Sequence, residues 1–332
     1  MEYIGKTIIE IGESEALSRA LSVFKRADST LLGSGDDAAV VSLSDPRVVI
    51  TTDTMVENHD FRTDWSSGFD LGFKAVTTNV ADLVAMGATP RALTVALVVS
   101  KQTKQAWLED FARGLQAACD QYSPRVEVVG GDLASGSEIV IAVTAHGDLA
   151  EASPVLRSTA KPGDLVVVAG TLGKAAAGLA LLNFDDPTAA ASYEELVAIQ
   201  LRPSPDVVLG LEISKTATAM MDISDGLSLD ARRLAKQSGV SIELEKRLLE
   251  GYAAVLEQAS QSINSRAGSQ LVNEWDWVLH GGEDHSFLVT LPSGAPLPRG
   301  AKVIGTVILQ RDHAVYLDAD PLQAKGWDSV RG

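Results

Sequence analysis

The sequence predicts a two-domain protein of the mixed α/β class, and three observations lead to this prediction. The chain has 332 residues, a length that suggests two domains or one large one. Hydrophobic residues make up 45% of it and charged residues 22%, the proportions of a globular protein. Runs of Val and Ile alternate with segments of helical periodicity in both halves, which is typical of α/β folds.

The domain boundary is expected near residue 150. The segment from 148 to 164 combines small and polar residues with Pro154 and Pro162, and it separates two strand-like apolar runs. We therefore predict an N-terminal domain over residues 1–150 and a C-terminal domain over residues 151–332.

In the N-terminal half, apolar runs between polar residues predict strands, and apolar residues three and four apart predict helices. The strands are expected at residues 38–43, 47–52, 92–99, 126–129 and 139–146, and the helices at 68–86 and 105–121. The first of these helices should end at Gly87, because Pro90 follows it.

The C-terminal half repeats a strand-then-helix order. A strand at residues 164–169 precedes an alanine-rich helix at 172–182, and a strand at 217–223 precedes a helix at 227–237. Gly239 is expected to end the second helix.

Composition excludes several classes of protein. The charges sum to −16, so the overall field repels nucleic acid and anionic membranes. No apolar run is long enough to span a bilayer and the start lacks the order of a signal peptide, which predicts a cytoplasmic protein. The single cysteine, Cys119, excludes an internal disulfide and is expected to be a small core residue.

Six short segments place Asp or Glu beside glycine or at the edge of an apolar run. They lie at residues 33–37, 51–54, 79–82, 130–132, 221–226 and 281–284. Any one of them could be an ordinary turn. Asp53, however, ends a strand-like run, and Asp82 lies among apolar residues of a predicted helix.

Carboxylates in such places are partly buried and repel one another, so a cation is expected between them. With few histidines and no cysteine cluster, oxygen ligation favours magnesium, manganese or calcium over zinc. Because magnesium usually leaves positions for phosphate oxygens, the pattern indicates a nucleotide or a phosphate ester.

The familiar phosphate-binding motifs are absent. Gly173-Lys174 is followed by Ala175, so there is no P-loop, and the two aspartates of residues 33–38 are wrong for a dinucleotide fingerprint. Residues 166–178 look more like a dinucleotide-binding strand, glycine turn and helix, but small residues there serve strand–helix packing equally well.

Eight segments in collinear order, between about residues 33 and 327, together carry a resemblance to a known family. They are GSGDDAAV, TTDTMVE, NVADLVAMGATP, GGDLASG, LRSTAKPGD, LRPSP, MDISDGL and HGGEDHSF. In this order the chain resembles the thiamine-monophosphate kinases, which belong to the superfamily of aminoimidazole ribonucleotide synthetase.

The resemblance implies a homodimer whose N-terminal sheets join, with an N-terminal domain for ATP and magnesium and a C-terminal domain that completes the active site. It also implies a role in thiamine diphosphate biosynthesis: magnesium-assisted, direct in-line transfer of a phosphoryl group from ATP to thiamine monophosphate.

Residue by residue, the resemblance implies the following site. The metal ligands would be Asp37, Thr51, Thr52, Asp53, Asp82, Asp132, Asp222 and Asp225, of which Asp132, Asp222 and Asp225 would also be catalytic. The ATP contacts would be Gly131, Arg157 and Ser224, and the substrate contacts Asp60, Glu283 and Trp327. Asp60 stands where the family usually has a histidine, and His59 lies beside it.

Two alternative functions stay open. A different ATP-using enzyme of the superfamily would share the carboxylates, although the HGGED segment and the closing GWD argue against it. A non-catalytic cation- or nucleotide-binding protein would keep the same residues without turnover. Arg157 could also be an exposed linker residue, and Trp327 a core anchor.

Overall fold

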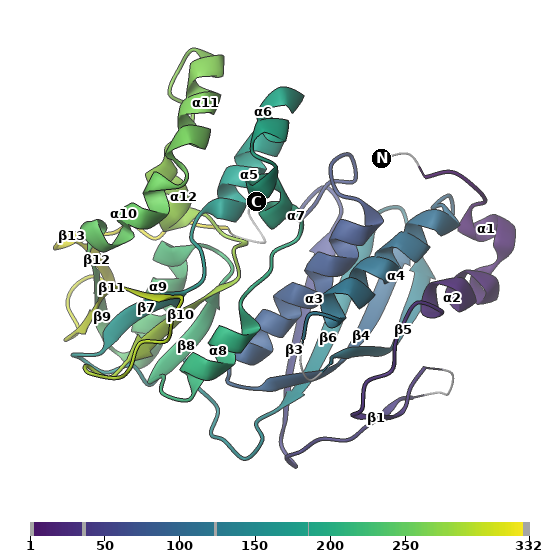
Figure 1. Cartoon of the computed structure of the whole chain (residues 1–332), viewed down its shortest axis with the longest axis horizontal. Helices are drawn as coiled ribbons and strands as arrows, with labels where there is room; N and C mark the ends of the chain where they lie inside the picture. Colours follow the sequence, from purple (N-terminus) through teal and green to yellow (C-terminus); the bar gives the residue numbers. More distant parts are fainter. Residues whose placement is uncertain (1–2, 35–37, 123–124, 185, 328–332) are drawn as a thin grey trace. The chain divides into compact units, whose positions relative to one another are not determined.

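The computed structural model describes residues 3–34, 38–122, 125–184 and 186–327 (Figure 1). Two compact units divide the chain: Met1–Leu83 with Ala88–Ala152, and Val84–Gly87 with Ser153–Gly332. Each unit contains both helices and strands, so the predicted mixed α/β class is confirmed. None of the helices in the described ranges has the length and apolar character needed to cross a membrane.

The first unit is built on a sheet flanked by helices. Its described strands are ordered β3 (Val48–Val56), β6 (Val140–Asp148), β4 (Thr89–Val99) and β5 (Glu127–Ser135). The pairs β3–β6 and β6–β4 are antiparallel, and β4–β5 is parallel. The helices α3 (Gly68–Ala85) and α4 (Gln105–Cys119) lie over one face of the sheet (Figure 1).

Helices α3 and α4 approach each other through glycines. A Cβ atom at Gly72 would lie 2.1 Å from the backbone oxygen of Phe111, and one at Gly114 would lie 2.0 Å from that of Phe69. Only glycine therefore permits this helix pair. Cys119, at the end of α4, is 1% exposed, which confirms the prediction of a core residue.

The N-terminal segment adds elements that the sequence analysis did not predict. They are α1 (Ile8–Ile11), α2 (Glu13–Leu21) and β1 (Thr30–Leu32), which pairs with β2 (Val40–Val41). The strand expected at residues 38–43 is thus reduced to two residues.

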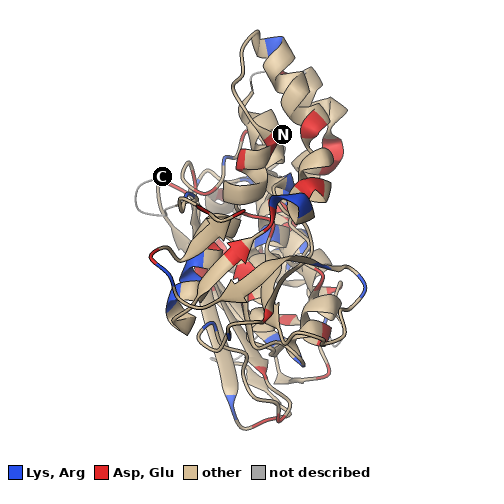
Figure 2. Cartoon of the chain, turned by 90° about the vertical axis from the view of Figure 1, so that its left-hand side faces the viewer, with Lys and Arg blue, Asp and Glu red and all other residues tan. Residues whose placement is uncertain are grey.

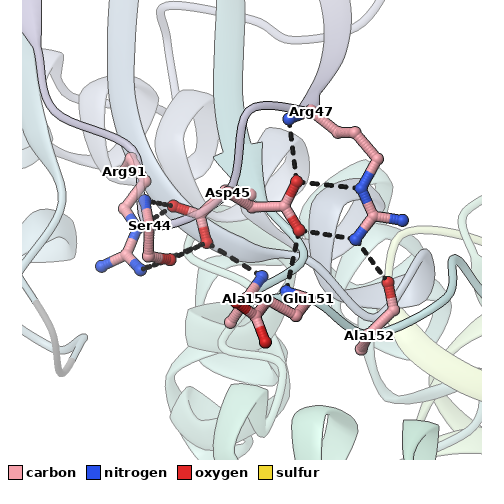
Figure 3. A network of polar contacts seen from close by, with 8 residues as sticks. Ser44, Asp45, Arg47, Arg91, Ala150, Glu151 and Ala152 are labelled. Atoms are coloured by element: carbon pink, nitrogen blue, oxygen red, sulfur yellow. Dashed lines mark hydrogen bonds and ion pairs between the residues drawn. The ribbon is translucent and has the colours of Figure 1, made fainter.

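Two buried aspartates fix the end of β6 and the loop that follows it (Figure 3). Asp148 is fully buried and accepts hydrogen bonds from Arg91 Nε (2.8 Å) and the hydroxyl of Ser44 (2.7 Å). Burial raises the pKa of Asp148, but these hydrogen bonds outweigh it and lower the pKa overall. Asp45 is held in the same way by the backbone and guanidinium of Arg47. Both charges are therefore paired, as buried carboxylates must be.

The second unit is built on a larger, mainly antiparallel sheet. Its described strands are ordered β13 (Asp320–Pro321), β12 (Val315–Leu317), β9 (Ser241–Leu244), β11 (Ala301–Ile308), β7 (Leu165–Ala169), β10 (Ser286–Leu291) and β8 (Ala219–Ile223). Only β12 and β9 pair in parallel among these strands. All residues of β8 and β10 are buried, which explains their continuous apolar character.

The helices of the second unit are α5 (Lys174–Asn183), α6 (Pro187–Ser192), α7 (Glu194–Leu201), α8 (Val207–Ser214), α9 (Leu227–Ser238), α10 (Lys246–Ala254), α11 (Glu257–Ala267) and α12 (Glu274–His280). Helix α9 packs against β8 and β9. It ends at Gly239, which has a φ of 65°, so this predicted helix end is confirmed.

Two acidic motifs lie inside strands, where the sequence analysis expected a strand end and a turn. Strand β3 continues to Val56, so Asp53 is in its middle. Strand β5 runs through Gly130, Gly131 and Asp132. The cause at Gly131 is a close approach to β4, because a Cβ atom there would lie 2.0 Å from the backbone oxygen of Val95.

Candidate functional site

Acidic residues lie on helices, strands and loops alike (Figure 2), so the net charge by itself marks no site. The geometry around each predicted residue is more informative. Among the described residues, no three Asp, Glu, His or Cys side chains already form a ligand set for a metal ion. Asp37 lies outside the described residues.

In the first unit, the structure brings Thr51 of β3 and Asp82 of α3 together. The hydroxyl of Thr51 donates a hydrogen bond of 2.7 Å to Asp82 Oδ2. Because strand residues alternate between faces, Asp53 shares the helix-covered face with Thr51. These three oxygen-bearing side chains are each half-buried, and they are of the type that magnesium binds.

Thr52 points to the opposite face of the sheet. Its hydroxyl donates to the backbone oxygen of Val143 (2.8 Å) and accepts from Thr144 (3.2 Å). A metal contact by Thr52 would therefore have to use its backbone oxygen.

Asp132 lies far across the sheet from Asp53. The register aligns Asp132 with Ala96, Ala142 and Thr54, on the face away from the helices. Since β3 and β5 are the two edges, three strand spacings, roughly 14 Å, separate Asp53 from Asp132. Within one sheet these two carboxylates cannot bind the same ion.

The carboxylate of Asp60 is held by the end of β3. Its Oδ2 accepts from the backbone nitrogen of Val56 (2.8 Å), and its Oδ1 lies 3.1 Å from Nδ1 of His59. Asp60 thus closes a turn and orients His59, the residue that the sequence places beside it.

Lys74 is a further candidate for the functional site, and none of the sequence motifs pointed to it. It is only 4% exposed, and it shares one face of α3 with Thr78 and Asp82, at spacings of four residues. A lysine inside an otherwise apolar helical run was the available signal.

An apolar cavity of about 260 Å³ lies in the first unit between α2, α4 and the strands β4 and β5. Its walls include Phe24, Leu108, Phe111 and Val128, and Gly131 and Asp132 also line it. The predicted nucleotide contact Gly131 therefore borders a space with an apolar lining.

In the second unit, five predicted residues come together from three segments. Asp222, Ser224 and Asp225 lie at the end of β8 and in the loop after it, and two other segments bond to that loop. The backbone nitrogen of Glu283 donates to Ser224 O (2.8 Å), and that of Trp327 donates to Asp225 O (3.1 Å). Trp327 is 37% exposed, which does not fit a core anchor.

Two buried residues that the sequence analysis did not assign support this cluster. Asp222 is 3% exposed, and its Oδ2 lies 3.4 Å from Nδ1 of the buried His285. Asp230, in the first turn of α9, is fully buried. Burial, followed by the charges of Asp222 and Asp225, raises the pKa of Asp230 to about 7. Asp222 and Asp225 carry oxygen donors of the kind that magnesium binds, although the described residues here do not by themselves form a set of three ligands.

Arg233 pairs with two of these acids. Its Nη1 pairs with Asp225 and lies 2.8 Å from Asp230 Oδ1. No sequence motif pointed to Arg233, because a charged residue three positions after an acid is common on helix surfaces.

The loop before β10 carries backbone strain. Glu283 and His285 have φ angles of 70° and 49°, which non-glycine residues rarely adopt. Between them, Asp284 is buried and accepts from the hydroxyl of Thr171 (2.7 Å), and burial raises its pKa. Strain of this kind is concentrated at functional sites.

The backbone of Arg157 lies at the other end of α9 from Asp225. Its backbone oxygen accepts from Ser238 at the far end of α9 (2.8 Å), whereas Asp225 precedes the start of that helix. The twelve residues of α9 span about 18 Å, which separates the backbone of Arg157 from the start of the helix.

Comparison with known proteins gives a consistent result. A family model described as AIR synthase related protein, N-terminal domain, matches residues 35–149. A thiamine-monophosphate kinase of Mycobacterium tuberculosis is 37% identical over 327 residues, which are 97% of this chain and 93% of that protein.

Solved structures agree in sequence and in fold. The thiamine-monophosphate kinase from Stenotrophomonas maltophilia K279a is 30% identical with a TM-score of 0.74, over 93% of this chain and 96% of that one. AaThiL complexed with AMPPCP and TMP is 29% identical with a TM-score of 0.73, over 98% of this chain and 99% of that one.

Proposed function

This chain belongs to the thiamine-monophosphate kinase family, as its motifs indicated, and from that membership we propose that it phosphorylates thiamine monophosphate with ATP. The acceptor oxygen would bond to the γ-phosphorus while the bond between that phosphorus and the β–γ bridging oxygen breaks. The products would be thiamine diphosphate and ADP. A relative in complex with AMPPCP, an ATP analogue, and TMP supports this pair of substrates.

The observation that carries the proposal is the cluster in the second unit. Asp222, Ser224, Asp225, Glu283 and Trp327 come from three distant segments and share one loop region. The sequence resemblance named all five residues for nucleotide, metal or substrate, and folding brings them together. A structural role alone would not require a tryptophan that is 37% exposed to be bonded through its backbone to the loop of Asp225.

Magnesium would be held by Asp53 and Asp82 in the first unit and by Asp222 and Asp225 in the second. When bound, it would neutralise the phosphate charges and align donor and acceptor for in-line transfer. The side chains themselves would bind and position the two anions. A phosphate oxygen is already a nucleophile, so the reaction needs no activated Ser or Cys.

We assign the base of ATP to the apolar cavity of the first unit. Its walls are Leu, Phe and Val side chains, which suit a flat heterocycle, and Gly131 borders it. The indole of Trp327 would stack on the cationic thiazolium of the other substrate, as aromatic faces attract cations.

We further propose a homodimer formed through the sheet of the first unit. The face opposite α3 and α4 leaves Val48 and Ile50 exposed, at 45% and 57%. Strand β3 is also a nine-residue edge strand, which is suited to pairing with another chain. Replacing Ile50 with Asp should shift the protein to monomers in light scattering, and an unchanged mass would refute this interface.

The decisive experiment is a product assay with thiamine monophosphate, ATP and magnesium, in which the phosphorylated product is identified by mass spectrometry. Asp225→Asn should reduce the rate by at least about a hundredfold while the protein stays folded, which excludes a contaminating kinase. Free thiamine should not react, because its hydroxyl ends one phosphate unit short of the position that the acceptor phosphate of thiamine monophosphate occupies. Binding of both substrates without turnover would instead favour the non-catalytic alternative. A cytoplasmic location stays a prediction.

A further inference from the structure

Arg233 is placed where a metal ion would also be attracted. It follows Asp230 by three residues on α9, and its Nη1 contacts the carboxylates of both Asp225 and Asp230. Asp225 is one of the predicted metal ligands, so one guanidinium nitrogen already compensates part of the charge that a metal would compensate.

The surroundings show why such a cation is needed. Asp222 and Asp230 are 3% and 0% exposed, and the backbone nitrogen of Asp225 donates to Asp230 Oδ2 at 3.1 Å. Arg233 Nη1 therefore lies between the carboxylates of Asp225 and Asp230, and like charges that share one cation in a partly buried place repel each other when that cation leaves. The side chain of Arg233 is 41% exposed, so it borders solvent.

We propose that Arg233 is an internal counter-cation that a divalent metal ion displaces from Asp225, so that this arginine sets the affinity of the site for metal. The proposal rests on the proposed function for the identity of the site. It adds Arg233, a residue that the family resemblance did not assign, and it makes this arginine a competitor of the metal ion for the carboxylate of Asp225. A weaker metal affinity is the direct consequence, since the ion must displace a cation already in place.

The test is binding of Mn²⁺ alone, without nucleotide, followed by electron paramagnetic resonance. Arg233→Gln should bind Mn²⁺ at least about tenfold more tightly than the wild type, because one positive charge beside the ion is gone. Arg232→Gln is the matched control: it makes the same charge change on the same helix turn, and none of the described ion pairs involves Arg232. It should change the affinity by less than about twofold.

Equal effects of the two variants, or weaker binding by Arg233→Gln, would overturn the proposal. A second measurement uses the wild-type protein, in case the variant folds poorly. In its ¹⁵N spectrum, the guanidinium signals of Arg233 should shift toward those of a solvated arginine as Mg²⁺ is added. Signals that stay unchanged while Mg²⁺ saturates the protein would also refute displacement.

The outcome is separable from that of the kinase assay. If the wild-type enzyme is active but Arg233→Gln does not change the Mn²⁺ affinity, only the proposed role of Arg233 as a counter-cation is refuted. An inactive wild-type protein that shows the tenfold contrast would refute the kinase and leave the counter-cation supported.

Discussion

Thr51 Oγ1 lies 2.7 Å from Asp82 Oδ2 and joins the edge strand β3 to helix α3. The bond fixes one oxygen of a carboxylate that the sequence predicted as a metal ligand. Its neighbour Thr52 makes its own hydroxyl bond on the other face, to Val143. Substituting each threonine in turn therefore distinguishes a contribution to the candidate metal site from a contribution to the stability of the fold.

Thr51→Val should raise the magnesium concentration for half-maximal activity several-fold, because Asp82 loses the bond that orients it, worth about 1 kcal/mol. Thr52→Val removes a hydroxyl of the same kind from the opposite face and should leave the magnesium dependence unchanged. The measurement is a magnesium titration of initial rates. Equal shifts in both variants would contradict a special role for Asp82.

ATP binding should depend on a divalent cation. The carboxylates repel a polyphosphate, so calorimetry in excess EDTA should show an ATP affinity at least about tenfold weaker than in magnesium. Adenosine carries no phosphate and serves as the control, since chelation should not change its binding. Undiminished ATP affinity in EDTA would refute metal-assisted binding.

Trp327→Ala should affect one substrate selectively. The Michaelis constant for thiamine monophosphate should rise about tenfold, in line with loss of roughly 1–2 kcal/mol of stacking on a cation, while that for ATP stays nearly constant. Because the indole is more than a third exposed, the melting temperature should fall by no more than a few degrees. A large stability loss with both constants raised together would show that Trp327 is structural.

Asp148→Asn should destabilise the first unit. Breaking a buried ion pair costs about 3–5 kcal/mol, which corresponds to roughly 10 °C in melting temperature for a unit of this size. Glu15→Gln is the control: it breaks the exposed Glu15–Arg19 pair and should change the melting temperature by about 1 °C at most.

The same pair predicts a pH dependence. The folded pKa of Asp148 is lower than its unfolded value, so its ionised form contributes stability above an unfolded pKa of about 4. That contribution is lost as the pH falls through the folded value. The gap in melting temperature between wild type and Asp148→Asn should therefore be constant from pH 7 to pH 5 and narrow below pH 4. A gap that widens on acidification would contradict this assignment.

Mixed dimers test how Asp53 and Asp132 cooperate. The width of the sheet keeps them apart within one chain, whereas Asp132 and the exposed Ile50 share the face assigned to the dimer. We expect Asp132 to act in the site of the partner subunit. Co-refolding equal amounts of Asp53→Asn and Asp132→Asn should then restore about a quarter of wild-type activity, since half of the dimers would hold one intact site. No recovery would show that both residues serve the same chain's site.

The periodic part of the fold was predictable from the sequence. Helices α4 and α9 have long amphipathic patterns with clear ends, α3 is a long run of helical periodicity that is buried on almost all sides, and strands β4 and β6 are largely apolar runs. The short elements were not predictable. Strand β10 has six residues, all buried, and a run of that length does not distinguish a strand from part of a buried helix.

Those residues of the candidate site that lie in sequence motifs were predictable. Those that join the site only through tertiary contacts were not. The DISDG and GGED segments pointed to Asp222, Asp225 and Glu283. Asp230 and Arg233 look like an ordinary pair on a helix surface, and only the packing of α9 on β8 shows that Asp230 is buried. The position of Asp132 likewise depends on strand order, which no local pattern encodes.

The contacts of Arg233 with Asp225 and Asp230 also bear on how the protein matures. Small zinc domains stay unfolded until their metal arrives, because nothing else compensates their ligands. Here a side chain of the same polypeptide supplies the positive charge, so a nascent chain can complete its second unit before it meets an ion. A cell short of magnesium would then accumulate folded but idle enzyme, and restoring the ion would switch on activity at once, without new synthesis.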